Sequence, residues 1–182
     1  MLRKVLVMCV VWMSLIPVSA QDKKKQWVDS VFQSLSVEEK VGQLFVIPVS
    51  SYLTKNEIDN LLDDIEDHHP GGLLITAGGP TGTVGLINTL QQQSRLQLLV
   101  MAEAERGAGG LLDSVIQMPP PLVIGAIRND SAVFEIGKEI AKQLKILGIH
   151  LNLAPNADHD LLPGRPDFYL GDDKTEVATK AT

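Results

Sequence analysis

The sequence is poor in cysteine and in long apolar runs. Cys9 is its one cysteine, so no disulfide can form within the chain and the core must hold without covalent cross-links. The one long apolar stretch, from Val5 to Val18, is shorter than the roughly 18 to 20 residues that a membrane-spanning helix needs. We therefore expect neither a disulfide scaffold nor a membrane span.

Basic residues are also in the minority. Lys and Arg number 16 against 22 Asp and Glu, which leaves a net charge of −6. Binding to a nucleic acid backbone requires a basic face, and the one basic run here is Lys23 to Lys25, close to the N-terminus. The charge balance therefore argues against nucleic acid as a partner.

The first twenty residues are typical of an export signal. Arg3 and Lys4 supply positive charge, the apolar run follows, and Val18-Ser19-Ala20 offers small side chains for cleavage. No cysteine stands at the cleavage point, so a thioether-linked lipid anchor is excluded. We expect residues 1–20 to be a signal peptide and residues 21–182 to be one exported domain, located in the periplasm or outside the cell after cleavage near Ala20.

Apolar segments of strand length alternate with amphipathic helices along the rest of the chain. The expected strands are residues 44–49, 73–76, 98–101 and 149–153. Continuously apolar strands that are separated by helices indicate a parallel sheet. The exported part is shorter than the roughly 200 to 250 residues of a complete (β/α)8 barrel. The predicted fold class is therefore α/β, a partial (β/α)8 barrel of about the first four β/α units.

Capping patterns mark the expected helix starts. Thr54 and Glu57 have the spacing of a capping box. Asp130 or Ser131 is expected to cap a later helix, after an irregular stretch that contains Pro119-Pro120-Pro121. A last helix is expected from about residue 176.

Ligands of parallel β/α folds bind at the loops that follow the carboxyl ends of strands. After the second strand, Gly78-Gly79-Pro80-Thr81-Gly82-Thr83 resembles a phosphate-binding loop at a helix N-terminus. It lacks the Lys-Ser/Thr pair of a P-loop, and Pro80 removes a backbone donor. A tight turn is the better interpretation.

The loop after the third strand has the richest pattern. Glu103 and Glu105 are two residues apart, so they point the same way if the strand geometry continues, and Arg106 follows directly. Paired carboxylates suit acid/base chemistry or the binding of sugar hydroxyls. The alternative is that Arg106 neutralises one glutamate while water solvates the other, and the spacing alone favours this alternative.

The loop after the fourth strand holds Asp158-His159-Asp160, residue types that can bind a metal ion, but no partner cluster stands at ligand spacing. Solvated loop charges are the better interpretation. His150 lies within an expected strand and is interpreted as a structural histidine. We predict no metal site and no cofactor.

Four stretches of the chain follow the order and spacing of a known domain. They are Ser36–Leu44, which starts with a capping box of Ser36 and Glu39, then Pro70–Ile75, Leu122–Ala126, and Leu147–Pro155 with Asp158 after it. Together they resemble the N-terminal domain of glycoside hydrolase family 3, of the exported β-N-acetylhexosaminidase and β-glucosidase type. The resemblance implies a (β/α)8-type fold, activity on O-glycosidic bonds and a carbohydrate ligand.

The resemblance also implies site residues. The family has a D-x-E pattern after the third strand, whose Asp binds sugar, and this chain has Glu103-Ala104-Glu105 there. The substrate-binding residues implied are Glu103, Glu105 and Asp158. Two departures stand out: Leu111 replaces an Arg that clamps the sugar, and Tyr169–Asp173 replaces an Arg-Ser-Phe-Gly segment without its Arg.

The family's Lys-His pair, acid/base loop and Asp nucleophile have no counterpart before Thr182. Retaining hydrolysis needs a nucleophile and a proton donor about 5 Å apart, so we expect no catalytic residues and no hydrolysis by this chain alone. Two alternatives stay open. The chain could be a non-catalytic carbohydrate-binding or assembly module that self-associates through open sheet edges, or a fragment of a longer active enzyme.

Overall fold

The structure, a computed structural model, describes residues 20–156, 169–171 and 173–181. Nineteen of the twenty residues of the predicted signal peptide lie outside this range. The chain divides into two compact units, with the boundary after Lys40.

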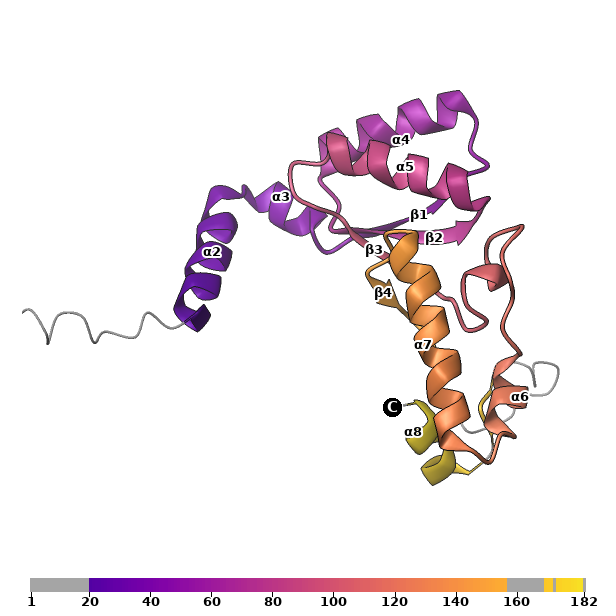
Figure 1. Cartoon of the computed structure of the whole chain (residues 1–182). Helices are drawn as coiled ribbons and strands as arrows, with labels where there is room; N and C mark the ends of the chain where they lie inside the picture. The colour runs from indigo at the N-terminus through magenta and orange to yellow at the C-terminus, as the bar shows by residue number, and fades with distance from the viewer. Residues whose placement is uncertain (1–19, 157–168, 172, 182) are drawn as a thin grey trace, which may run out of the picture. The chain divides into compact units, whose positions relative to one another are not determined.

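The described part of the first unit, residues 20–40, is largely helical. α2 spans Ala20–Ser34, and α3, Val37–Gly42, begins in this unit (Figure 1). The predicted capping box is present, because the Ser36 hydroxyl accepts the Glu39 N–H at 3.1 Å and the Glu39 carboxylate accepts the Ser36 N–H at 2.7 Å. This local pattern alone therefore fixes the start of α3.

The second unit holds the sheet and its helices (Figure 1). The strands are β1 Val46–Ser50, β2 Gly72–Ala77, β3 Leu99–Ala102 and β4 Leu151–Asn152. The helices are α4 Lys55–His68, α5 Pro80–Gln93, α6 Pro121–Gly125, α7 Asp130–Ile146 and α8 Lys174–Ala181, with a 3-10 turn η1 at Ala108–Gly110.

All four strands are parallel and lie in the order β1-β2-β3-β4. One row of the register runs across the whole sheet through Val49, Ile75, Ala102 and Asn152. Each strand thus pairs with the next one in the chain, and a helix lies in the connection. This arrangement confirms the predicted α/β fold, a partial (β/α)8 barrel.

One face of the sheet forms the main core. Leu73 and Val100 are fully buried there, and they belong to one cluster with Ile65 of α4, Leu90 of α5 and Leu144 of α7. The three helices therefore cover the same face of the sheet, because strand side chains alternate between the two faces.

The opposite face of the sheet is apolar and partly open. Val46, Leu99 and Leu151 occupy the alternate positions of β1, β3 and β4, and they are 42%, 45% and 42% exposed. Parallel sheets normally have both faces covered. Within the described residues, this second face has no covering helix layer comparable to that on the first.

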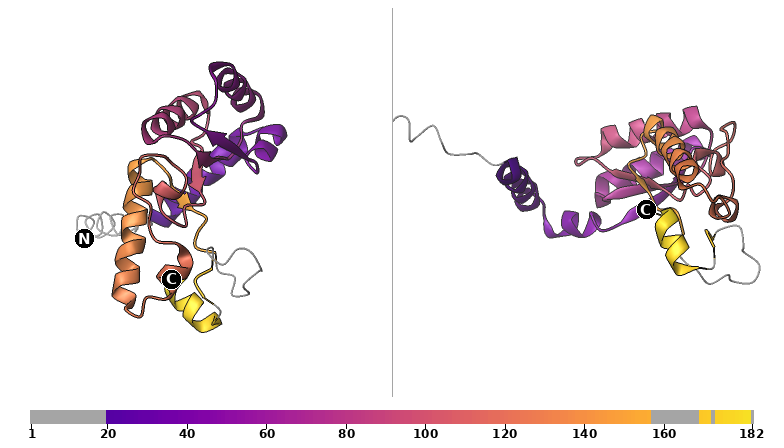
Figure 2. Two further views of the ribbon diagram at one scale, coloured as in Figure 1. Left: turned by 90° about the vertical axis from the view of Figure 1, so that its right-hand side faces the viewer. Right: turned by 60° about the horizontal axis from the view of Figure 1, so that its bottom comes forward.

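A smaller apolar cluster forms where α6, α7 and α8 meet (Figures 1 and 2). The buried residues of this cluster are Ile124 in α6, Val177 in α8 and Leu170, which precedes α8. Val133 and Ile136 of α7 pack against them. The cluster fixes α8, the predicted last helix, beside the first half of α7.

The helix starts only partly follow the sequence predictions. Thr54 and Glu57 form the expected capping box of α4. The cap of α7 is instead Asn129, whose Oδ1 accepts the Ser131 N–H at 3.0 Å, so the assignment to Asp130 or Ser131 was wrong. Asn129 has an extended backbone, as an N-cap requires, whereas Asp130 is already helical.

The stretch that was expected to be irregular contains a short helix, α6. Pro121 is its first residue and Pro120 precedes it with an extended backbone. Proline has no backbone N–H, but the N–H of the first helical residue has no acceptor within the helix. A proline at this position therefore costs no helical hydrogen bond. A run of three prolines thus marks a helix start here.

The fourth strand is shorter than predicted, since β4 has only two residues. The hydrogen bonds between β3 and this segment nevertheless extend further. The His150 N–H donates to the Val100 carbonyl and the Leu153 N–H donates to the Ala102 carbonyl, both at 2.8 Å. In the described part of the chain no helix is long and apolar enough to cross a membrane.

Candidate functional site

The carboxyl end of β3 leads into Glu103-Ala104-Glu105, and a side chain from β4 holds this segment in place. The Asn152 Oδ1 accepts the Ala104 N–H at 2.9 Å, and its Nδ2 donates to the Ala104 carbonyl at 3.4 Å. Ala104 is fully buried. The backbone between the two glutamates is therefore fixed by the neighbouring strand.

Glu105 is half-buried, and its carboxylate is only partly satisfied. It accepts the backbone N–H of Asn156, whereas its Oε2 is buried and has no hydrogen-bond partner in the described part of the chain. Burial raises the pKa of the Glu105 carboxyl above its ordinary value, the Asn156 N–H opposes this, and the charge of Glu103 raises it further. Glu105 thus holds a proton more readily than an ordinary glutamate.

Glu103 is exposed, and its charge adds to the rise in the pKa of Glu105, so the two predicted carboxylates are close enough to interact electrostatically. Among the described residues, Arg106 forms no ion pair with either of them. Its Nε donates instead to the Met118 carbonyl at 3.3 Å. The alternative in which Arg106 neutralises a glutamate therefore does not describe this loop.

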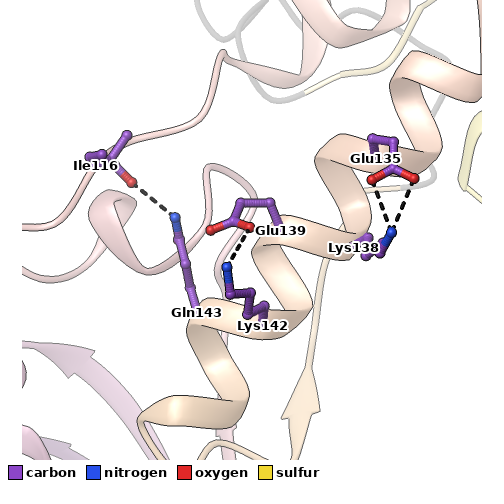
Figure 3. A network of polar contacts seen from close by, with 6 residues as sticks. All are labelled: Ile116, Glu135, Lys138, Glu139, Lys142 and Gln143. Atoms are coloured by element: carbon purple, nitrogen blue, oxygen red, sulfur yellow. Dashed lines mark hydrogen bonds and ion pairs between the residues drawn. The ribbon is translucent and has the colours of Figure 1, made fainter.

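The rest of the loop after β3 is tied to α7 by Gln143. Its Oε1 accepts the Ala108 N–H at 3.0 Å. Its Nε2 donates to the Ile116 carbonyl at 3.4 Å (Figure 3). The neighbouring pairs of Figure 3, Glu135 with Lys138 and Glu139 with Lys142, are exposed and contribute little to stability. Gln143 is thus the side chain of this network that positions the loop.

Leu111, for which the family resemblance led us to expect the loss of an arginine, is partly buried and packs against the main core. Leu111 therefore contributes an apolar core contact from the loop after β3.

A cavity of about 650 Å³ lies beside Glu105. Its walls come from the ends of β3 and β4, one side of α7, and parts of α6 and α8, and they include Glu105, Asn152, Ile136 and Lys180. This volume is within the range of small-molecule sites, roughly 300 to 1,000 Å³.

The tight turn predicted for Gly78–Thr83 was wrong, because Gly79 is the N-cap of α5 and Pro80 to Thr83 already belong to that helix. Gly78 has a φ of +151°, and a Cβ there would lie 2.1 Å from the Ser51 Oγ. The Ser51 Oγ in turn accepts the Gly79 N–H at 3.0 Å. The glycines therefore serve a close packing contact with the loop after β1.

Tyr52 and Asp113 form a second polar pair at the same end of the sheet. The Tyr52 hydroxyl donates to the Asp113 Oδ2 at 2.5 Å, and this bond raises the pKa of Tyr52. Sequence patterns did not point to this pair, because its members are 61 positions apart.

Of the remaining predicted residues, Asp158 and the Asp158-His159-Asp160 segment lie outside the described residues. His150 behaves as a structural histidine, since its Nδ1 accepts the Val100 N–H at 3.1 Å. No cluster of metal-ligating side chains occurs in residues 20–156, 169–171 and 173–181.

Known proteins share this architecture. β-Glucoside phosphorylase BglX with bound 2FGlc is 24% identical with a TM-score of 0.79, over 92% of this chain and 30% of that one. β-N-Acetylglucosaminidase from Thermotoga maritima is 21% identical with a TM-score of 0.60, over 77% of this chain and 29% of that one. These similarities establish the fold.

Sequence comparison gives the family. A β-N-acetylglucosaminidase/β-glucosidase from Cellulomonas fimi is 25% identical over 145 residues, which are 80% of this chain and 25% of that protein. The chain therefore spans only about a quarter of this relative's length. The model of the glycosyl hydrolase family 3 N-terminal domain matches residues 36–163. The chain belongs to glycoside hydrolase family 3.

Proposed function

We propose that this chain binds the sugar of a β-glycoside at the carboxyl end of β3, where Glu103 and Glu105 accept hydrogen bonds from sugar hydroxyls. The observation that carries the proposal is the buried Oε2 of Glu105, an acceptor with no partner in the described residues. A buried acceptor left unpaired costs free energy, and a neutral hydroxyl is a donor that would satisfy it.

Two further observations support a carbohydrate ligand. The site lies at the strand ends where parallel β/α folds bind their ligands. The Cellulomonas fimi relative is named for activity on β-N-acetylglucosaminides and β-glucosides. Asp158, the third substrate contact implied by the family resemblance, stays a prediction.

We also propose that the isolated chain does not hydrolyse glycosides. Glu103 and Glu105 lie on one loop, whereas retaining hydrolysis uses two groups about 5 Å apart on either side of the scissile bond. Leu111 adds an apolar side chain where a charged sugar clamp would be needed.

The binding proposal can be tested by NMR titration of the purified chain with methyl β-glucoside and methyl β-N-acetylglucosaminide. We expect one of them to bind, and Glu103→Gln or Glu105→Ala to weaken binding about tenfold, the value of one charge-assisted hydrogen bond. Glu135→Gln is the matched control, because Glu135 lies on the exposed side of α7. Equal binding by all four proteins, or no binding by any of them, would contradict the proposal.

The inactivity proposal needs a separate assay. Chromogenic β-glucosides and β-N-acetylglucosaminides should release no product above a buffer blank with the wild-type chain. Turnover that disappears in the Glu105→Ala variant would show this part of the proposal to be wrong.

A second function, assembly with another copy of the chain, is favoured by the open apolar face of the sheet. Leu151 is 42% exposed there, and it belongs to β4, which is the edge strand of the sheet among the described residues. Light scattering after size exclusion should find a dimer that Leu151→Lys dissociates. Ile146→Lys is the control, since Ile146 is exposed on α7, away from the sheet. A wild-type monomer would rule this function out.

We propose, finally, that the chain is exported and cleaved near Ala20. The support is the sequence pattern of residues 1–20 alone. The intact mass of the product from cells that express the full sequence should correspond to a chain that starts close to Gln21. A product that retains Met1 to Ala20 would contradict the export proposal.

A further inference from the structure

α2, the indigo helix of Figure 1, carries its large apolar side chains on one side. Trp27 and Val31 are four positions apart, and so are Val28 and Phe32, which makes the four residues neighbours on the helix surface. We call these four residues the apolar stripe of α2. Trp27 is 66% exposed and Phe32 is 60% exposed. Exposed apolar side chains that are contiguous in this way mark a surface that binds a partner.

Lysines border the apolar stripe at its N-terminal end. Lys23 lies four positions before Trp27, at one border of the stripe. Lys25 lies three positions before Val28, at the other border. Lys24 is between them, in line with the stripe, and all three lysines are exposed. Positive charge therefore flanks one end of the apolar surface.

The remaining charges of this unit follow the same arrangement. From residue 23 to the end of α2, Asp29 is the one acidic residue, and it lies two positions after Trp27, on the side of the helix away from the stripe. At the other end of the stripe, the Lys40 Nζ is 4.4 Å from the centre of the Phe32 ring. Both ends of the stripe thus have a cation next to them.

This charge pattern argues against a second copy of the chain as the partner. In a parallel pair of stripes, the lysines of one copy would meet the same lysines of the other. In an antiparallel pair, they would meet Lys40. Lys24 would also lose water in the contact without gaining an opposite charge, which is costly.

A surface of anionic lipids fits the same pattern. The long apolar stem of a lysine can lie along acyl chains while its ammonium group reaches a lipid phosphate. Tryptophan is enriched where a membrane meets water, because its ring is apolar and its N–H is polar. The net charge of −6 does not prevent this contact, since charges in solution interact over only about 8 Å at physiological ionic strength.

We propose that α2 binds the surface of a membrane that contains anionic lipids. The helix lies in the plane of the interface, with the apolar stripe among the acyl chains and the lysines at the phosphates. α2 has 15 residues, fewer than the roughly 20 that cross a bilayer, so it lies on the membrane and does not span it. The inference goes beyond sugar binding and does not depend on it.

Trp27 provides the signal for a test. The sequence has two tryptophans, and the other, Trp12, belongs to the expected signal peptide, whose apolar run would itself bind lipid. The test therefore uses the chain that begins at Gln21, the product expected from export, in which Trp27 is the one tryptophan. Every described strand and every described helix starts at or after Ala20, so this chain keeps them.

The probes are vesicles of phosphatidylcholine alone and vesicles of phosphatidylcholine with phosphatidylglycerol. We expect the emission of Trp27 to shift to shorter wavelength, and the protein to sediment with the vesicles, when phosphatidylglycerol is present. Replacing Lys23, Lys24 and Lys25 together by glutamine should weaken binding about a hundredfold. Phe32→Ser should weaken it about tenfold, because less apolar surface leaves water.

α7 offers matched controls for both changes. Replacing Lys138, Lys142 and Lys145 together by glutamine changes the net charge by the same amount, on exposed positions of another helix. Phe134→Ser removes a phenylalanine that is 70% exposed. Both control proteins should bind the vesicles as wild type does. Circular dichroism checks that all variants keep their helices.

Three results would overturn the proposal. The first is equal binding to both kinds of vesicle, or binding to neither. The second is a lysine variant of α2 that binds as tightly as its α7 control. The third is a shift of Trp27 emission without vesicles that grows with protein concentration and that Phe32→Ser removes, because the stripe would then bind a second copy of the chain.

Discussion

The side chain of Asn152 bonds both backbone polar groups of Ala104. Its Oδ1 accepts the Ala104 N–H at 2.9 Å, and its Nδ2 donates to the Ala104 carbonyl at 3.4 Å. A side chain of β4 thereby completes the hydrogen bonding of the residue between Glu103 and Glu105. The geometry of the candidate site thus depends on a residue that does not itself need to contact a ligand.

Replacing Asn152 should therefore destabilise the fold and weaken the site together. Asn152→Ala leaves the buried Ala104 N–H without its acceptor, which costs about 1 to 3 kcal/mol of the free energy of unfolding. Urea denaturation measures this loss. Asn88→Ala, on the exposed side of α5, should change stability by less than about 0.5 kcal/mol. Similar values for the two variants would show that the Asn152 contacts contribute nothing.

Gly78 and Gly85 should respond to alanine with opposite signs. A Cβ on Gly78 would lie 2.1 Å from the Ser51 Oγ and 2.8 Å from the Thr83 Oγ1, at a positive φ, so Gly78→Ala should lower the unfolding free energy by more than about 1 kcal/mol. Gly85 has open space in α5, and Gly85→Ala should raise it by about 0.5 to 1 kcal/mol. Stabilisation by Gly78→Ala in thermal or urea unfolding would contradict the close contact proposed between Gly78 and Ser51.

The parts of the fold that could be predicted from the sequence are those encoded by neighbouring residues. The Thr54–Glu57 capping box is a contact between residues three positions apart. An apolar strand such as β2 can likewise be recognised from a local run of about five or six residues. Asn152 could not be assigned in this way, because its partner is 48 positions away. The sequence showed only that Asn152 is a polar residue in an otherwise apolar strand. It did not indicate which backbone group its side chain would bind.

The candidate site was predicted in part for the same reason. Glu103 and Glu105 were found from their spacing, but the burial that raises the pKa of Glu105 depends on how α7 and the loop after β4 pack around it. α6 was missed because a run of prolines ordinarily ends a helix, whereas Pro121 begins one.

Removing the hydroxyl of Thr83 should stabilise the fold. The side chain is 1% exposed, and its Oγ1 has no hydrogen-bond partner among the described residues. Valine has nearly the same shape without the polar atom, so Thr83→Val should raise the free energy of unfolding by about 1 kcal/mol. Thr89→Val is the control, since that exposed hydroxyl donates to the Gly85 carbonyl at 3.0 Å and little gain is expected. A Thr83→Val variant less stable than wild type would mean that the hydroxyl is bonded in solution.

Glu105 and Glu57 should give stability profiles with opposite pH dependence. Burial raises the pKa of Glu105 in the folded state, so the folded protein binds this proton more tightly than the unfolded chain does. The stabilisation that comes from protonated Glu105 is complete below the ordinary glutamate pKa and is lost as the pH rises through the raised value. Glu105→Gln cannot titrate, and its stability relative to wild type should therefore increase from acid to neutral pH.

Glu57 provides the opposite sign. The Thr54 hydroxyl and backbone N–H lower the pKa of Glu57, so its contribution is present above the ordinary glutamate pKa and is lost as the pH falls through the lowered value. Urea denaturation of wild type, Glu105→Gln and Glu57→Gln between about pH 3 and pH 7 measures how the contribution of each glutamate to stability depends on pH. Relative to wild type, Glu57→Gln should become less stable toward neutral pH, while Glu105→Gln becomes more stable. Two profiles of the same sign would mean that burial does not control the protonation of Glu105. An exposed glutamate in a helix cap and a half-buried glutamate whose Oε2 has no partner among the described residues should differ in this respect.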